Sequence, residues 1–202
     1  MKQFIILLFV LTSFAVYGQR KLSLNFNDFQ KWNVVLKDKN TKPDEVFKFS
    51  GNVLTIGTAS NGYIRTKKLY SSYTLQLEWR WVNQPGNGGV LLHIQSPDSV
   101  WPVCYQVQQK VNAVGDLICM NGLKATQCVD AVKFTVPKKM PSSEMPAGEW
   151  NKLMIQVKKD NITVYLNGVL QNSISGLSVN KGYIGFQAEG GKPMEIRNYK
   201  LK

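Results

Sequence analysis

Two side chains capable of acid–base or anion-binding chemistry, Glu78 and Arg80, alternate with apolar residues in the segment Tyr73–Val82. In a strand, this alternation places them on the face opposite Trp79 and Trp81. One interpretation is a solvated outer face that carries a cross-strand ion pair. The other is a ligand-facing surface on which Glu78 acts as acid or base and Arg80 binds an oxyanion or hydroxyl groups.

A second set of residues suits sugar recognition. Gln106 and Gln108 share one face of a short alternating segment, and each amide offers two donors and one acceptor to sugar hydroxyls. Trp101 follows a loop, where an indole ring either stacks on a sugar or fills the core. Asp116 and Glu189 are acids beside glycines, where the backbone can approach a ligand closely.

His93 is the one histidine of the chain. A site built from two or three histidine ligands is thereby excluded, and a histidine-based triad would have to use His93. Alternation predicts that its ring lies on the face opposite Val90, Leu92 and Ile94, as either a structural or a catalytic residue. The motifs of α/β-hydrolases, zinc proteases and dinucleotide-binding enzymes are absent from the sequence.

The elements that must position these residues are short strands, because turn signals recur about every ten residues and no helical period follows residue 18. Asn167-Gly168 is typical of a tight hairpin, and 121–147, with three prolines, is predicted to be loop-rich. The pattern predicts an all-β fold of one domain over 19–202, two antiparallel sheets packed as a jelly-roll sandwich. The predicted strands are Val46–Phe49, Val53–Ile56, Tyr73–Val82, Val90–Gln95, Val103–Gln109, Lys152–Val157, Ile162–Leu166, Val169–Ile174, Tyr183–Gln187 and Met194–Leu201.

Residues 1–18 have the pattern of a secretory signal peptide, with Lys2 before an apolar run too short to span a bilayer. We therefore expect an exported protein, periplasmic or secreted, without a membrane span. Export permits a disulfide between Cys119 and Cys128, and the alternative is that the three cysteines are buried thiols. The formal net charge of +12 is carried by scattered lysine pairs rather than a patch interleaved with aromatic residues, so a nucleic-acid partner is not expected.

Several short motifs, in this order, resemble the 3-keto-disaccharide hydrolase family over roughly residues 24 to 202. They include Gly62-Tyr63-Ile64-Arg65, Leu77-Glu78-Trp79-Arg80, Val90-Leu91-Leu92-His93, Val100-Trp101-Pro102, Gln106-Val107-Gln108, Gly115-Asp116, Glu149-Trp150-Asn151 and Ala188-Glu189-Gly190-Gly191.

This resemblance implies a concanavalin-A-like jelly roll with a ligand groove on its concave sheet. It also implies cleavage of glycosides oxidised at C3, in which the ketone acidifies the C2 proton and a base removes it. By resemblance, Glu78 or His93 is the base and Arg80 stabilises the enolate. Trp101, Gln106, Gln108, Asp116 and Glu189 would then shape the groove and bind the substrate.

One departure is important. The family usually carries an acid where this chain has Gln106, and an amide cannot transfer a proton as a carboxylate can. Three alternatives are left open: a glycoside-cleaving enzyme, a carbohydrate-binding module without catalysis, which Gln106 favours, and a basic envelope protein that binds acidic glycans. No organic cofactor is expected, no metal ligands are assigned, and use of a divalent metal is left open.

Overall fold

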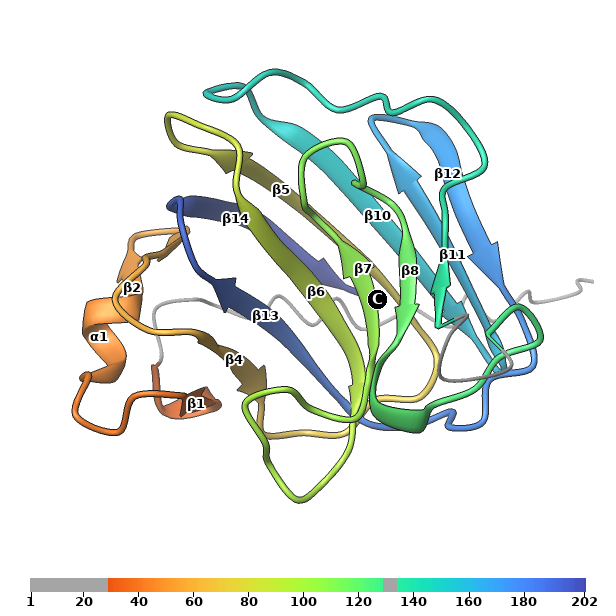
Figure 1. The fold of residues 1–202 in the computed structure, drawn as a ribbon, viewed down its shortest axis with the longest axis horizontal. Helices are drawn as coiled ribbons and strands as arrows, with labels where there is room; N and C mark the ends of the chain where they lie inside the picture. The colour runs from red at the N-terminus through yellow and green to blue at the C-terminus, as the bar shows by residue number, and fades with distance from the viewer. Residues whose placement is uncertain (1–28, 129–133) are drawn as a thin grey trace, which may run out of the picture.

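The computed structural model describes residues 29–128 and 134–202, and the predicted signal peptide lies outside them. Two antiparallel sheets of seven strands each are stacked face to face as a jelly-roll sandwich (Figure 1). We call the sheet nearer the viewer in Figure 1 the front sheet and the other the back sheet. The predicted all-β fold is therefore confirmed.

The front sheet has the strand order β1-β4-β13-β6-β7-β8-β9. Its strands are β1 (Trp32–Leu36), β4 (Gly62–Thr66), β13 (Tyr183–Glu189), β6 (Asn87–Ile94), β7 (Tyr105–Gln108), β8 (Leu117–Cys119) and β9 (Thr135–Val136). The back sheet has the order β12-β11-β10-β5-β14-β3-β2. Its strands are β12 (Val169–Ile174), β11 (Asn161–Leu166), β10 (Asn151–Lys158), β5 (Tyr73–Trp81), β14 (Met194–Leu201), β3 (Val53–Ile56) and β2 (Phe47–Ser50). Three single-turn helices complete the elements: η1 (Phe29–Lys31), α1 (Pro43–Val46) and η2 (Met120–Gly122).

Strand alternation produces the core between the two sheets. Along β5, every second side chain from Tyr73 to Trp81 is buried, and the residues between them are partly exposed. The front sheet contributes Val90, Leu92 and Val107 to the same core. Each fully buried aliphatic side chain stabilises the fold by about 1.5–3 kcal/mol, so this shared core is what holds the sheets together.

Four front-sheet strands were not predicted: β1, β4, β8 and β9. In β4 all five residues are buried, so there is no alternation of polar and apolar positions to detect. β8 and β9 have only three and two residues, too few to establish a period. Val46 belongs to α1 rather than to a strand, because Pro43 begins a helical turn there.

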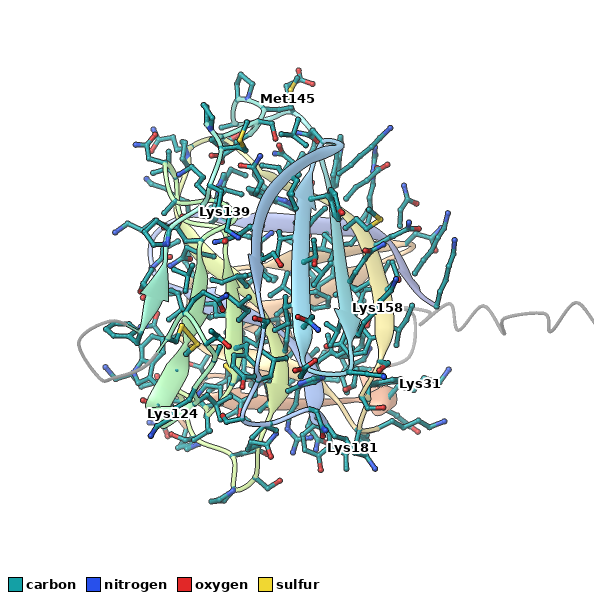
Figure 2. The ribbon with its side chains drawn as sticks, turned by 90° about the vertical axis from the view of Figure 1, so that its right-hand side faces the viewer. Lys31, Lys124, Lys139, Met145, Lys158 and Lys181 are labelled. Carbon is teal, nitrogen blue, oxygen red and sulfur yellow. A yellow bond between two sulfur atoms is a disulfide. The ribbon has the colours of Figure 1, made fainter. Side chains whose placement is uncertain are left out.

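Exposed lysines lie on several separate parts of the described surface, as the sequence predicted. Lys31, Lys124, Lys139, Lys158 and Lys181 lie well apart in Figure 2. A disulfide joins Cys119 and Cys128, with the Cα atoms 6.3 Å apart, and Cys104 is a buried free thiol. In the described part of the chain, no helix has the length and apolar character needed to cross a bilayer.

Candidate functional site

A groove of about 960 Å³ lies on the outer face of the front sheet. Its floor is formed by side chains of β13, β6, β7 and β8 that point away from the core. The lining residues are Asn87, Trp101, Gln106, Gln108, Lys110, Ile118, Cys119, Met120, Asn121, Gly122, Leu123, Lys124, Phe134, Gln187 and Glu189. This volume is ample for a small-molecule ligand.

Three glutamines, Gln106, Gln108 and Gln187, form part of the floor. The Gln106 amide Nε2 donates to Oε1 of Gln187 at 2.8 Å and to Oε1 of Gln108 at 3.3 Å. Gly89 makes this possible, because a Cβ there would lie 2.5 Å from Gln106 Nε2. In the described hydrogen bonds, the Nε2 groups of Gln108 and Gln187 donate to no protein atom, so they are available to a polar ligand.

Glu189 and Lys110 lie at one end of this floor. We use the name amide end for these two residues together with Asn87 and the three glutamines. Glu189 pairs with Asn87 across β13 and β6. Burial raises the pKa of Glu189 above its ordinary value, and the positive charge of Lys110 partly opposes that shift. The pKa of this carboxylate therefore lies nearer neutrality, which suits a group that takes up and returns a proton.

The opposite end of the groove, the aromatic end, is formed by Trp101, Phe134, Met120, Asn121 and Lys124. Trp101 and Phe134 are 40% and 44% exposed, so their rings are open to a ligand. Strand register locates this end. The backbone N–H of Cys119 donates to the Phe134 carbonyl, and Cys119 pairs with Tyr105, the first residue of β7. Lys110, in contrast, lies two residues after Gln108, the last residue of β7.

The loop that carries Trp101 is held at both sides. Arg65 on β4 donates from Nε and Nη2 to the two carboxylate oxygens of Asp98, at 2.8 and 2.7 Å, and the Tyr63 hydroxyl donates to the same group at 3.1 Å. On the other side, Asn121 Nδ2 donates to the Trp101 carbonyl at 2.6 Å. The guanidinium of Arg65 is buried and lies 3.9 Å from the centre of the Tyr183 ring. The position of Trp101 is therefore fixed by the sheet rather than by the loop alone.

Glu78 and Arg80 lie elsewhere, on the outer face of the back sheet. Glu78 accepts from Arg197 Nε at 2.7 Å, and Arg80 Nε donates to Glu195 at 2.8 Å. Arg80 and Arg197 both lie over the ring of Trp150. Of the two interpretations of this polar face, the structure shows the outer face with cross-strand ion pairs.

The environment of Glu78 also disfavours acid–base chemistry. Its partial burial raises the pKa, but hydrogen bonds from Arg197 and Asn198 outweigh this, and the pKa lies below its ordinary value. Glu78 thus stays ionised and paired at neutral pH. Because the core separates its sheet from the groove, it does not share a site with the groove residues.

His93 is completely buried, and the predicted face for its ring is wrong. The pairing of β6 with β13 shifts register between Leu91 and Ile94, and His93 has a positive φ of 51°. This bulge turns the ring into the core, where it packs against Tyr73 and Tyr105.

Inside the core, both His93 ring nitrogens lie 3.2 Å from backbone carbonyls, those of Val179 and Ser71. Burial lowers the pKa of the ring, against the smaller raising effect of the two carbonyls. His93, Glu78 and Arg80 therefore do not come together as one catalytic site.

Asp116 has a structural contact. Its Oδ1 accepts from the backbone N–H of Lys138 at 2.8 Å, which ties the start of β8 to the segment after β9. Of the predicted site residues, the groove brings together Trp101, Gln106, Gln108 and Glu189.

Asn87, Lys110, Gln187 and Phe134 line the groove but were not predicted as site residues. Gln187 had a detectable signal, since it alternates with core residues as Gln106 does. Lys110 and Phe134 lie outside the strands, where no period applies. Within residues 29–128 and 134–202, no group of three or more His, Cys, Asp or Glu side chains is arranged to hold a metal ion.

Comparison with known proteins agrees with this architecture. The family model described as a 3-keto-alpha-glucoside-1,2-lyase-like domain matches residues 21–202. A putative glycosyl hydrolase from Parabacteroides distasonis has a TM-score of 0.65 and 20% identity, covering 88% of this chain and 90% of that one. A second from the same organism has a TM-score of 0.61 and 22% identity, covering 85% and 98%. The carbohydrate-binding module CBM66 from Bacillus subtilis is similar at a TM-score of 0.60 and 11% identity, covering 85% and 96%. Among curated proteins, no match was found.

Proposed function

The chain belongs to the 3-keto-alpha-glucoside-1,2-lyase-like family, and we propose that it binds and cleaves 3-keto-glycosides in the groove of the front sheet. The observation that carries the proposal is the amide end. There, one carboxylate with a raised pKa, Glu189, lies beside Lys110 and a floor of three carboxamides. Carboxamides match the donors and acceptors of sugar hydroxyls.

The proposed reaction begins at C2 of the oxidised ring. The Glu189 carboxylate takes the C2 proton, and the C–H electron pair forms an enediolate whose negative charge rests on the C3 oxygen. Positive charge on Lys110 and N–H groups of Gln108 and Gln187 would stabilise that oxygen. The C1–O bond then breaks, a C1=C2 double bond forms, and the aglycone oxygen takes the proton back from Glu189. Addition of water across the double bond completes a net hydrolysis.

This assignment replaces the base and the enolate stabiliser expected from the resemblance. Glu189 takes the role expected of Glu78 or His93, and Lys110 with the carboxamides takes that of Arg80. The reason is location, since the groove is separated by the core from the outer face that holds Glu78 and Arg80.

The decisive experiment measures aglycone release from a 3-keto-glycoside and from the same glycoside without oxidation. We expect cleavage of the oxidised substrate alone, because only the ketone acidifies C2. Glu189→Gln should lower kcat by about 100-fold or more, the usual contribution of a general base. Glu78→Gln is the matched control on the back sheet, and it should leave kcat within about twofold. Loss of turnover in Glu78→Gln with retention in Glu189→Gln would overturn the assignment.

A second candidate function is sugar binding without cleavage. It is favoured by Gln106, an amide where the family usually has an acid, so Glu189 is the one carboxylate among the described residues lining the groove. Calorimetric titration with oligosaccharides separates the two functions. Binding without cleavage of either substrate would identify a carbohydrate-binding module. We further propose export of the mature chain, as residues 1–18 predict; detection of the uncleaved chain in the cytoplasm alone would contradict this.

A further inference from the structure

We infer that the outer face of the back sheet carries a second binding site, which recognises a uronic acid unit of an acidic polysaccharide. The site is a hollow of about 360 Å³ over β11, β10, β5 and β14. The core lies between this hollow and the groove of the front sheet, so the inference goes beyond the proposed function and does not rest on it. The lining includes Gln76, Lys152, Met154, Tyr165, Asn198 and Lys200.

Strand pairing places four of these residues side by side in one row across the sheet. Gln76 on β5 pairs with Met154 on β10 and, on its other side, with Lys200 on β14. Met154 in turn pairs with Tyr165 on β11. Adjacent strands lie about 4.8 Å apart, so the row from Tyr165 to Lys200 is roughly 14 Å long. A sugar ring has room between the phenol ring at one end of the row and the ammonium group at the other.

The hollow has an excess of positive charge. Glu78 is the one acid among the described residues that line it, and its ion pair is with Arg197. Lys152, the neighbour of Glu78 on β10, and Lys200 are both exposed. Within residues 29–128 and 134–202, neither lysine forms an ion pair. One carboxylate is thus surrounded by three cations, and a carboxylate on the ligand complements that charge.

The other side chains of the hollow suit a sugar ring. Tyr165 and Met154 are partly exposed, and a tyrosine ring stacks on apolar faces while its hydroxyl forms hydrogen bonds. Among the described hydrogen bonds, the Gln76 side chain makes one, a donation to the Met154 sulfur at 3.6 Å. The Asn198 amide donates to Glu78 at 3.0 Å and has a second N–H group. These amides match the donors and acceptors of sugar hydroxyls.

The combination selects one class of ligand. A neutral sugar would leave both lysines without a counter-charge, and an inorganic anion would leave the Tyr165 ring without a partner. A uronic acid has a ring, hydroxyl groups and a carboxylate, so it uses every part of the hollow. A polysaccharide held on this face leaves the groove on the opposite sheet open to its own ligand.

The test is calorimetric titration of the full chain with trisaccharides of galacturonate, glucuronate and mannuronate. Two matched controls are the methyl esters of these trisaccharides, which lack the charge, and a glutamate tripeptide, which has carboxylates without sugar rings. We expect at least one uronate to bind, with a Kd that rises about tenfold between about 50 and 500 mM NaCl. Binding of none of the three, or equal binding of the methyl esters, would overturn the inference. Equal binding of the tripeptide would overturn it in favour of an acidic peptide.

Charge variants locate the site. Replacing both Lys152 and Lys200 by glutamine should weaken uronate binding about five- to tenfold, as expected for two charge contacts at an exposed site. Replacing Lys67 and Lys181 by glutamine removes the same charge from exposed positions outside the hollow, and should leave Kd within about twofold. Equal losses in the two double variants would mean that net charge alone attracts the ligand, which would contradict a site at the hollow.

Two further variants separate the hollow from the groove. Tyr165→Ala should weaken uronate binding about fivefold, whereas Tyr165→Phe should retain most of the affinity because the ring remains. Lys110→Gln, in the groove of the front sheet, should leave the affinity for uronates unchanged. If Lys110→Gln abolishes binding and Tyr165→Ala does not, the uronate binds in the groove and the inference is wrong. None of these outcomes depends on cleavage of a 3-keto-glycoside, so the failure of the proposed function and that of this inference are distinguishable.

Discussion

The ion pair between Arg65 and Asp98 offers a sharp test of how the front sheet is held together. Arg65 is 6% exposed, whereas the Asp98 side chain is 32% exposed. In Asp98→Asn, the guanidinium stays buried without a counter-charge. Loss of one partner of a fully buried pair costs about 3–5 kcal/mol, and the partial exposure of Asp98 reduces this to about 2–3 kcal/mol. For a domain of this size, that corresponds to a fall in Tm of about 5–10 °C.

The reverse substitution should be milder. In Arg65→Met, the remaining Asp98 carboxylate reaches solvent, and the methionine side chain keeps contact with Tyr183. We therefore expect a smaller destabilisation than in Asp98→Asn. The double variant should be destabilised by less than the sum of the destabilisations of the two single variants. Urea denaturation of all four proteins measures this coupling directly.

The pH dependence of the same pair has a defined sign. Hydrogen bonds from Arg65 hold the pKa of Asp98 below its ordinary value, against the desolvation that raises it. The stabilisation is present above the unfolded-state pKa of about 4 and is lost as the pH falls through the lower folded-state value. The difference in stability between wild type and Asp98→Asn should thus shrink below pH 4. A difference under about 0.5 kcal/mol at pH 7 would refute the reasoning, since that is what a solvent-exposed pair contributes.

Two further predictions concern buried groups. His93 has a lowered pKa in the folded protein, so folding opposes its protonation, and stability should fall as the pH drops below about 6.5. Urea titrations between pH 7 and 5 should show the free energy of unfolding changing by about 1 kcal/mol per pH unit. His93→Gln should remove this pH dependence, and an unchanged dependence would mean that another group is responsible. Cys128→Ser should cost about 2–3 kcal/mol, because the disulfide closes a loop with a sequence separation of 9. Reductant should lower the urea midpoint of the wild-type protein but not that of the variant, and a shift in both would contradict the assignment.

Recurring turn signals and a series of short strands were enough to predict a sandwich, and the alternation of β7 placed Gln106 and Gln108 on the face opposite Tyr105 and Val107. It could not tell which outer face holds the groove, because Glu78 and Gln106 follow the same rule in different sheets. That distinction depends on strand order, which arises from pairings between segments far apart in the chain.

His93 shows a second limit of the same reasoning. A bulge of one residue moves a side chain to the opposite face, and nothing in the sequence Leu91-Leu92-His93-Ile94 marks it. Alternation could not locate Trp101 or Phe134 for a different reason: Trp101 was assigned to the groove by the resemblance, and Phe134 was not predicted at all. Both lie outside strands, and their places are set by Asp98, Asn121 and the pairing of β8 with β9.

The place of β14 in the back sheet has a consequence for how the chain reaches its folded state. β14 comes last among the described strands in the sequence, yet it lies between β5 and β3 in the interior of the sheet. Until it has been synthesised, β5 and β3 each lack a neighbour, and the aromatic side chains of β5 have no closed core to enter. Domains with such long-range pairing fold slowly, because the entropy of closing a long loop is lost before the stabilising contacts between distant strands can form. Until β14 pairs with them, β5 and β3 therefore present open sheet edges and apolar side chains, the features that make folding intermediates prone to aggregate.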